Sequence, residues 1–166
     1  MHGSEWEALR ELRLRSLRSD PAAFGSTLAE ELAFDAGRWK ERAERAATAL
    51  TVAQWVAEGG SGRLIGTTVI VEVEKVVHIF AMWVDPEFRG QGIGGSLLDA
   101  ALEWGRSAFP GKSVVLEVNP QQTAAVRLYE SRGFQATATY RPLGHTTGQQ
   151  VREMILPPGN DPLPVD

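Results

Sequence analysis

A glycine-rich loop between a hydrophobic strand and an amphipathic helix constrains this sequence more than any other feature. The loop has glycine at positions 90, 92, 94 and 95, together with Arg89. The run 76–84 before it is mostly apolar, as in a buried strand, and apolar residues recur at helical spacing from Ile93 to Trp104. Loop N–H groups and the positive end of the helix dipole can then face the same ligand, which predicts a pyrophosphate site.

Other interpretations of the loop fit less well. A glycine-rich turn without a ligand is common, but here the flanking strand and helix supply the context of a phosphate site. No Gly-Lys-Ser/Thr follows, which disfavours a nucleotide-binding protein that uses the loop for ATP. A dinucleotide fingerprint needs an acidic residue at the end of the next strand, whereas Asp99 and Glu103 fall inside the helix.

The loop resembles the signature of a known enzyme superfamily. Residues Arg89 to Gly94 match Gln/Arg-x-x-Gly-x-Gly/Ala of the GCN5-related N-acetyltransferases, and the lead-in from Val84 to Arg89 reads Val-x-Pro-x-x-Arg. Leu128-Tyr129 and Gly133-Phe134 resemble a later motif of the same superfamily. Within it, the segment 113–157 is most similar to the ribosomal-protein alanine N-acetyltransferases.

The resemblance implies an α/β fold of the α+β type. We expect a single mixed, mostly antiparallel twisted sheet with helices on both faces and strands that splay at the acetyl-CoA site. One acetyltransferase domain is expected over 1–157, followed by an extended or disordered tail over 158–166. The superfamily usually begins with a strand, whereas this chain enters a helix about five residues after Met1. Either the first edge strand is missing or the chain start is assigned late.

Hydrophobic periodicity predicts the individual elements. Asp20-Pro21 should end the first helix, and 58–62 should form a hairpin turn. The expected helices cover 6–17, a stretch through Trp39 and Arg45, the segment from the glycine-rich loop to about 107, and 123–131. The expected strands cover 50–57, 64–73, 76–84, 114–118, 134–140 and 152–156.

The implied activity is direct transfer of an acetyl group from acetyl-CoA to a primary amine. The sequence has no cysteine, which excludes a covalent thiol intermediate. We slightly prefer a small-molecule acceptor, such as an antibiotic or metabolite, to a protein N-terminus or lysine. A non-catalytic acyl-CoA-binding regulatory domain is the alternative.

Three residues are candidates for proton transfer. Tyr129 occupies the position of the superfamily's tyrosine, and a phenol is protonated at neutral pH and can donate to a leaving thiolate. Glu117 lies twelve residues before it, the spacing of base and acid in the ribosomal branch, and burial in a strand would raise its pKa. His78 lies where histone-type members carry a glutamate. Each residue also has a purely structural interpretation. Tyr129 could pack in the core, Glu117 could pair with an arginine, and His78 could be a structural residue of the strand with its hydrogen bonds satisfied.

The resemblance also implies which residues bind the cofactor. Backbone groups of Met82, Trp83 and Val84 are expected to contact the pantetheine arm. Gln122 stands where the superfamily commonly has asparagine and is expected to reach the cofactor. The pyrophosphate is expected on Arg89, Gly90, Gln91, Gly92, Ile93, Gly94, Gly95 and Ser96.

Acceptor specificity is expected in two segments that flank the cleft, Phe24–Trp39 and the hairpin 141–150. The hairpin includes His145, which is expected to contact the acceptor or water. Glu30, Glu31 and Asp35 could attract a cationic amine, although such a run more commonly forms a solvated helix face.

Bulk properties exclude several classes. A net charge of −4 argues against nucleic-acid binding. No apolar run approaches a membrane span, and no signal-peptide pattern opens the chain, so we expect a cytoplasmic protein. The three histidines, His2, His78 and His145, are far apart, which argues against a metal site. The partner is expected to be the amine substrate, and the chain a monomer or a homodimer.

Overall fold

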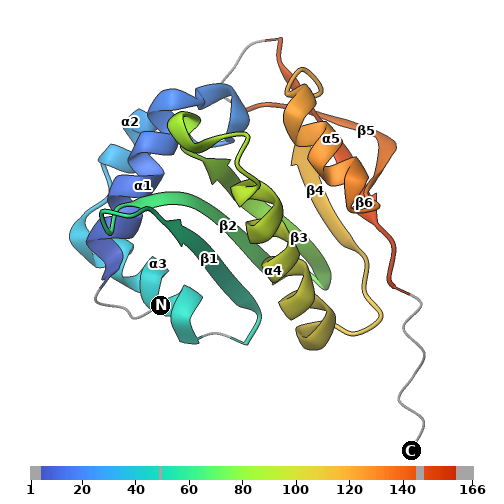
Figure 1. The fold of residues 1–166 in the computed structure, drawn as a ribbon, viewed down its shortest axis with the longest axis horizontal. Helices are drawn as coiled ribbons and strands as arrows, with labels where there is room; N and C mark the ends of the chain where they lie inside the picture. Colours follow the sequence, from blue (N-terminus) through green and yellow to red (C-terminus); the bar gives the residue numbers. More distant parts are fainter. Residues whose placement is uncertain (1–4, 49, 145–147, 160–166) are drawn as a thin grey trace, which may run out of the picture.

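The computed structural model describes residues 5–48, 50–144 and 148–159. One sheet of six strands, ordered β1-β2-β3-β4-β6-β5, forms its centre (Figure 1). The helices are α1 (Trp6–Ser19), α2 (Leu28–Leu32), α3 (Ala36–Thr48), α4 (Ile93–Ala108) and α5 (Thr123–Ser131), with short 3-10 turns η2 (Pro21–Ala23) and η3 (Pro86–Phe88). The strands are β1 (Val52–Glu58), β2 (Leu64–Val73), β3 (Val76–Val84), β4 (Val114–Val118), β5 (Gln135–Pro142) and β6 (Gln150–Leu156).

The sheet is mixed and mostly antiparallel, as predicted. β3 and β4 are the parallel pair, joined through α4, and the other neighbouring strands pair antiparallel. Helices cover both faces. The main core packs α4 and α5 on alternate residues of the central strands, including Ile70, Val77 and Leu116. A second core places Leu12 and Leu17 of α1 against Trp83. The predicted fold class is therefore confirmed.

The predicted helical stretch through Trp39 and Arg45 is preceded by a second, separate helix, α2. A capping box starts α2: the Thr27 hydroxyl accepts from the Glu30 N–H at 3.2 Å, and the Glu30 carboxylate accepts from the Thr27 N–H at 2.7 Å. At the start of α3, the Asp35 carboxylate accepts from the Arg38 N–H at 2.8 Å. Two N-terminal caps in close succession explain the division into two helices.

A bulge in β3 creates the space for the site. Val69 pairs with Phe80 but Thr67 pairs with Trp83, so two residues of β3 lie opposite Thr68. One of them, Ala81, has φ of +52°. A bulge bends its strand and increases the twist. Beyond this kink β3 diverges from β4.

The divergence of β3 and β4 is the predicted splay. The two strands pair only near their starts, Val77 with Val114 and His78 with Val115. β4 continues to Val118 beside β6 instead. The second half of β3 therefore has a partner strand on its β2 side, whereas its β4 side faces the gap.

Within the described residues no strand precedes α1. The two ends of the sheet are formed by β1 and β5. The predicted tail over 158–166 lies outside the described residues apart from its first two positions. Within the described part of the chain, no helix has the length and apolar character needed to cross a membrane. The domain bounds of 1–157 remain a prediction.

Candidate active site

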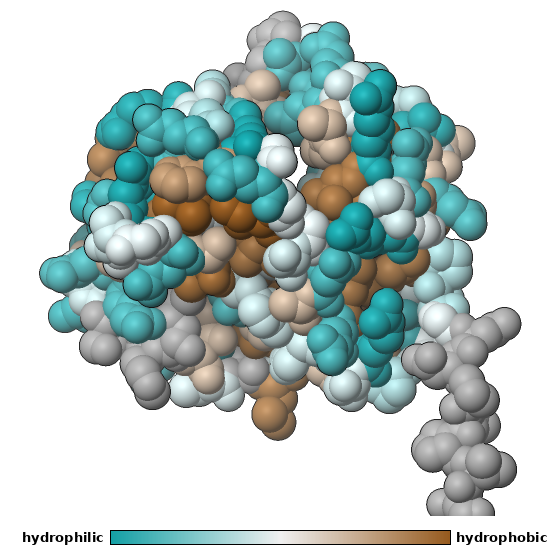
Figure 2. Space-filling view, viewed as in Figure 1, coloured by the Kyte–Doolittle hydropathy of each residue, from teal (hydrophilic) through white to brown (hydrophobic). Residues whose placement is uncertain are grey.

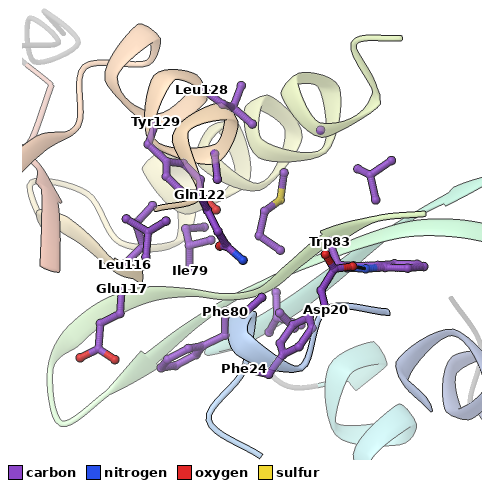
Figure 3. A pocket seen from close by; sticks show the side chains of 18 of the residues that line it. Asp20, Phe24, Ile79, Phe80, Trp83, Leu116, Glu117, Gln122, Leu128 and Tyr129 are labelled. Carbon is purple, nitrogen blue, oxygen red and sulfur yellow. Dashed lines mark hydrogen bonds between the residues drawn. The ribbon is translucent and has the colours of Figure 1, made fainter. Parts of the chain in front are cut away.

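A cavity of about 1150 Å³ opens where β3 and β4 diverge. Figure 3 shows Gln122, Leu128 and Tyr129 on one side of β3, and Phe24 and Phe80 on the other. We call the first the loop side, because it includes the glycine-rich loop, and the second the arginine side, because it includes Arg13, Arg42 and Arg45. Figure 2 shows a hollow on the face viewed in Figure 1, bordered by apolar side chains between α4 and α5.

The glycine-rich loop has the conformation of an anion-binding turn. Gly90 and Gly92 have φ of +77° and +80°, and a Cβ at either position would meet open space. The left-handed conformation, and not crowding, therefore favours glycine there. Gly92 is the N-cap of α4, and Gly92 to Gly95 line the cavity. The first N–H groups of a helix have no partner inside it, so they can bind a ligand anion.

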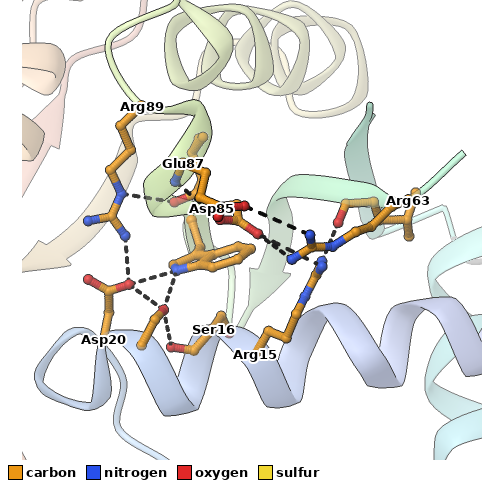
Figure 4. A network of polar contacts seen from close by, with 11 residues as sticks. Arg15, Ser16, Asp20, Arg63, Asp85, Glu87 and Arg89 are labelled. Atoms are coloured by element: carbon orange, nitrogen blue, oxygen red, sulfur yellow. Dashed lines mark hydrogen bonds and ion pairs between the residues drawn. The ribbon is translucent and has the colours of Figure 1, made fainter. Parts of the chain in front are cut away.

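The Arg89 side chain fixes the loop to α1 (Figure 4). Its Nη2 donates to the Asp20 carboxylate at 2.6 Å and its Nε donates to the Val84 carbonyl at 2.9 Å. The Trp83 indole N–H donates to the same carboxylate at 2.8 Å. Burial opposes ionisation of Asp20, but hydrogen bonds from Ser19, Arg89 and Trp83 outweigh it and lower its pKa. Because Asp20 holds the guanidinium of Arg89, the contact expected between Arg89 and pyrophosphate would come from its backbone and not from its side chain.

A buried carboxylate, Asp85, supports the same end of the loop from β3. It accepts from Arg63 Nη2 at 2.9 Å and, at the start of η3, from the Glu87 N–H at 3.2 Å. Arg15 lies 3.8 Å from it and also donates to the Leu64 carbonyl (Figure 4). These contacts join β2, α1 and the start of the loop, so several segments fix this end of the loop.

Tyr129, the candidate proton donor, lies in the wall of the cavity. Its side chain is 6% exposed and lines the loop side of the cavity. Burial raises the pKa of Tyr129 to about 12, so the phenol stays protonated at neutral pH. Its ring packs edge-on against Phe134, whose centroid is 5.9 Å away. The tyrosine thus belongs to the core and also to the cavity wall. Its role as a proton donor stays a prediction.

Glu117 faces the cavity, but the predicted burial is wrong. Its neighbours Leu116 and Val118 are buried in the core, whereas alternation along β4 turns Glu117 to the opposite face. The side chain is 37% exposed and lies 3.4 Å from Arg141 Nε. The carboxylate therefore combines two of the expected roles, because it pairs with an arginine and also lines the cavity.

His78 does not line the cavity. Its ring stacks on Phe80 with centroids 5.2 Å apart and an interplanar angle of 5°. Burial lowers the pKa of His78, while the nearby Glu117 and Glu153 oppose that shift and Arg141 adds to it. The imidazole is therefore neutral at pH 7 and packs beside the ring of Phe80, which lines the cavity. Of the two candidate bases, the geometry favours Glu117.

The remaining expected contacts are close to the loop. Backbone or side-chain atoms of Met82, Trp83 and Val84 line the cavity, as does Gln122, the N-cap of α5. Asn119, three residues earlier, is buried and forms a turn: its carboxamide oxygen accepts from the Gln121 N–H at 2.9 Å. Two of the predicted loop residues, Gln91 and Ser96, do not line the cavity.

The arginine side was missed by sequence reasoning. Glu31 was expected on a solvated face, but it is 2% exposed and accepts from Arg13 at 2.7 Å and Arg42 at 3.2 Å. Burial opposes its ionisation, while Arg13, Arg42 and Ser26 outweigh burial and lower its pKa. These arginines stand on α1 and α3, far from every motif. The capping box of α2 was visible in the sequence and would have placed Glu31 in the first turn of that helix.

Within the described residues no cluster of histidine and acidic side chains could hold a metal ion. Of the expected specificity segments, residues 24–26 and 142–144 line the cavity, whereas His145 lies outside the described residues. The second segment meets the cavity through the connection between β5 and β6.

Comparisons with known proteins agree with this geometry. Residues 6–134 match the model of the acetyltransferase (GNAT) family. N-acetyltransferase 8B of Rattus norvegicus is 36% identical over 94 residues, which are 53% of this chain and 41% of that protein. The chain thus spans about two fifths of this curated relative.

Solved structures share the fold. An acetyltransferase of the GNAT family from Streptococcus pneumoniae superposes with a TM-score of 0.81 at 19% identity, covering 96% of both chains. A Salmonella typhimurium structure with its cofactor acetyl-CoA has a TM-score of 0.77 at 21% identity, covering 99% of this chain and 95% of the other. At these identities the likeness establishes the fold.

Proposed function

Because the chain belongs to the acetyltransferase (GNAT) family, we propose that it transfers the acetyl group of acetyl-CoA to the primary amine of a small molecule, such as an antibiotic or metabolite. The cavity through the β3–β4 gap carries this proposal. It joins the glycine-rich loop to a second compartment lined by charged and aromatic side chains. Its volume of about 1150 Å³ is more than the roughly 300–1000 Å³ of ordinary ligand pockets. Two substrates can therefore meet there.

The residues on the loop side fit acetyl-CoA. The N–H groups of Gly92 to Gly95 would hold the diphosphate at the positive end of α4. Past Ile79, the β4 side of β3 has no partner strand. Backbone groups of Met82 to Val84 can therefore pair with the amides of the pantetheine arm, as an exposed strand edge pairs with an added strand. When bound, acetyl-CoA supplies an activated thioester.

Glu117 and Tyr129 divide the proton transfers. The amine must be neutral to attack, so Glu117, directly or through a water, accepts its proton. A carbon–nitrogen bond then forms and the carbon–sulfur bond breaks. Tyr129 donates its proton to the departing sulfur, because a pKa of about 12 keeps the phenol protonated at neutral pH. The acylated nitrogen loses its remaining extra proton to solvent, and solvent returns a proton to the phenolate. His78 holds Phe80 in place and stays neutral.

Coverage of the arginine side supports the preference for a small acceptor. The η2–α2 connection contributes Phe24 to the cavity and the β5–β6 connection contributes Leu143, and both side chains are buried. A protein N-terminus or lysine remains the second candidate, because the spacing of Glu117 and Tyr129 resembles that of ribosomal-protein alanine N-acetyltransferases. A regulatory domain that only binds acyl-CoA is the third.

The test is release of free thiol from acetyl-CoA with a panel of small primary amines and of peptides. We expect small amines to be turned over with higher kcat/KM than peptides. Turnover of peptides alone would reverse the choice of acceptor. Binding of CoA without turnover of any acceptor would support the regulatory alternative. Binding of ATP in preference to CoA would reject the family's chemistry for this loop.

A further inference from the structure

The arginine side carries more positive charge than the protein neutralises there. Arg13 of α1 and Arg42 of α3 share the carboxylate of Glu31. Arg45, about one turn after Arg42 on α3, lines the same cavity. It has no ion pair within the described part of the chain. Two guanidinium groups thus share one carboxylate and a third lines the same cavity. An anionic ligand group would complete the cluster.

Arg13 has a donor without an acceptor. Its Nε and Nη2 donate to Glu31 at 3.0 and 2.7 Å, whereas Nη1 is buried and has no hydrogen-bond partner. The guanidinium carbon lies 4.5 Å from the centroid of the Phe24 ring, which fixes its position. An unpaired buried N–H costs free energy and calls for a specific reason. A ligand acceptor in the cavity that Arg13 lines would supply one.

The electrostatics of Arg42 point the same way. Burial lowers the pKa of Arg42, and the neighbouring positive charges of Arg13 and Arg45 add to this while Glu31 opposes it. A second negative charge at this position would relieve the repulsion among these guanidinium groups. A cationic acceptor such as a polyamine would increase the repulsion instead.

The other end of the compartment has the opposite character. Glu117 lines it from β4, next to the gap through which the loop side is reached. Between Glu117 and the arginines the lining is apolar, with Phe80, Val69 and Val71 of the sheet. Phe80 is 45% exposed, unusual for a phenylalanine in the middle of a central strand. Figure 3 shows its ring on the side of β3 that faces Phe24.

From this arrangement we infer that the acceptor is a primary amine that also carries a carboxylate, as amino acids do. The amine faces Glu117 and the gap, the apolar part lies on Phe80, and the carboxylate accepts from Arg13, Arg42 and Arg45. This inference rests on the proposed acetyl transfer and specifies its substrate class.

The test compares amino acids with the amines that lack only their carboxylate. The pairs are leucine with isoamylamine, 4-aminobutyrate with n-propylamine, and 6-aminohexanoate with n-pentylamine, which vary the distance between the two groups. Spermidine and a peptide with a free N-terminus complete the panel. For at least one pair we expect kcat/KM of the amino acid to exceed that of its amine by about tenfold to a hundredfold, because charge-assisted hydrogen bonds are lost with the carboxylate.

The variants test the arginines directly. Arg45→Gln should lower the ratio of kcat/KM between amino acid and amine by about tenfold, and Arg45→Lys should restore part of it. Lys40→Gln is the matched control, since Lys40 lies on α3 outside the cavity lining. Its ratio should equal that of the wild type. A fold change in the ratio cannot come from general destabilisation, because both substrates are measured on the same variant.

Failure of the inference and failure of the proposed function give different results. Ratios near one or below in all pairs, with turnover of amines, would overturn the inference and keep acetyl transfer. The inference is also overturned if spermidine or the peptide is the best acceptor, or if CoA binds and no panel member is acetylated. Absence of both turnover and CoA binding by calorimetry would reject the proposed function itself.

Discussion

Tyr129→Phe removes one hydroxyl and leaves an aromatic ring of the same shape. The tyrosine is 6% exposed and its ring contacts Phe134. Burial is the cause of its raised pKa, and no hydrogen bond of the hydroxyl contributes to the shift. Because the change breaks no such bond, we expect the free energy of unfolding to change by less than about 1 kcal/mol.

The same change should reduce turnover strongly. Without the phenol, the departing thiolate must take its proton from water, so we expect kcat to fall by about tenfold to a thousandfold. CoA affinity should be kept, since the loop of Gly90 to Gly95 is untouched. Thiol release measures kcat, calorimetry with CoA measures binding, and thermal unfolding verifies the fold.

The raised pKa gives an independent magnitude. Burial raises the pKa of Tyr129 from its ordinary 10.0 to about 12. Each unit corresponds to about 1.4 kcal/mol, so the protonated form adds about 3 kcal/mol to stability. When the pKa of a group is higher in the folded than in the unfolded state, its contribution to the stability of the folded state is complete at pH values below the unfolded pKa. The contribution is therefore present below pH 10 and is lost as the pH rises through 12.

Comparison of the wild type with Tyr129→Phe isolates this contribution. The unfolding free energy of the wild type should fall by about 2 kcal/mol more than that of the variant between pH 9 and 12. The chain has two tyrosines, so the difference in phenolate absorbance between the proteins reports Tyr129 alone. Unchanged kcat in the variant would reject the role of Tyr129 as proton donor. If the Tyr129 phenol titrates near pH 10, the proposed effect of burial on its pKa is rejected.

Further changes test the rest of the site. Glu31→Gln should lower the free energy of unfolding by about 3 kcal/mol, because it leaves Arg13 and Arg42 without their counter-ion. In the same urea titration, the change at an exposed position, Glu41→Gln, should alter this free energy by less than about 0.5 kcal/mol. Gly92→Ala, at φ of +80°, should weaken CoA binding by about tenfold through roughly 1–2 kcal/mol of backbone strain, and Gly60→Ala in the β1–β2 turn should leave calorimetric affinity unchanged. Glu117→Gln should lower kcat/KM by about a hundredfold and His78→Gln by less than about threefold; equal losses would contradict the choice of base. Since the pKa of His78 is lowered, its neutral form stabilises above pH 6.5, and the wild type should lose more stability than His78→Gln as pH falls below that value.

The sequence predicted the elements that have strong local signals. The glycine-rich loop, the hairpin turn before β2 and the end of α1 at Asp20-Pro21 all carry side-chain or backbone requirements that can be read from a few neighbouring letters. Tyr129 was found by motif position. The mixed, mostly antiparallel sheet and its splay at the cofactor site followed from the family resemblance and not from periodicity.

Other parts of the site depend on contacts between distant segments. Glu117 interrupts an apolar run, which suggested burial, but only the position of β4 in the sheet decides which face it occupies. Glu31 looked solvated beside Glu30, yet arginines from α1 and α3 enclose it. The bulge at Ala81 has no local signal, because alanine rarely adopts positive φ. Such features arise from tertiary packing.

The central claim is that main-chain amides of the loop bind the diphosphate of CoA. An NMR titration of ¹⁵N-labelled protein with CoA tests it residue by residue, since glycine amides resonate in a distinct region. The account predicts that the largest shifts fall on Gly92, Ile93, Gly94 and Gly95, and that the same amides shift little with pantetheine, which has no phosphate. If CoA binds while the signals of these four amides stay unshifted, the loop amides do not bind its diphosphate.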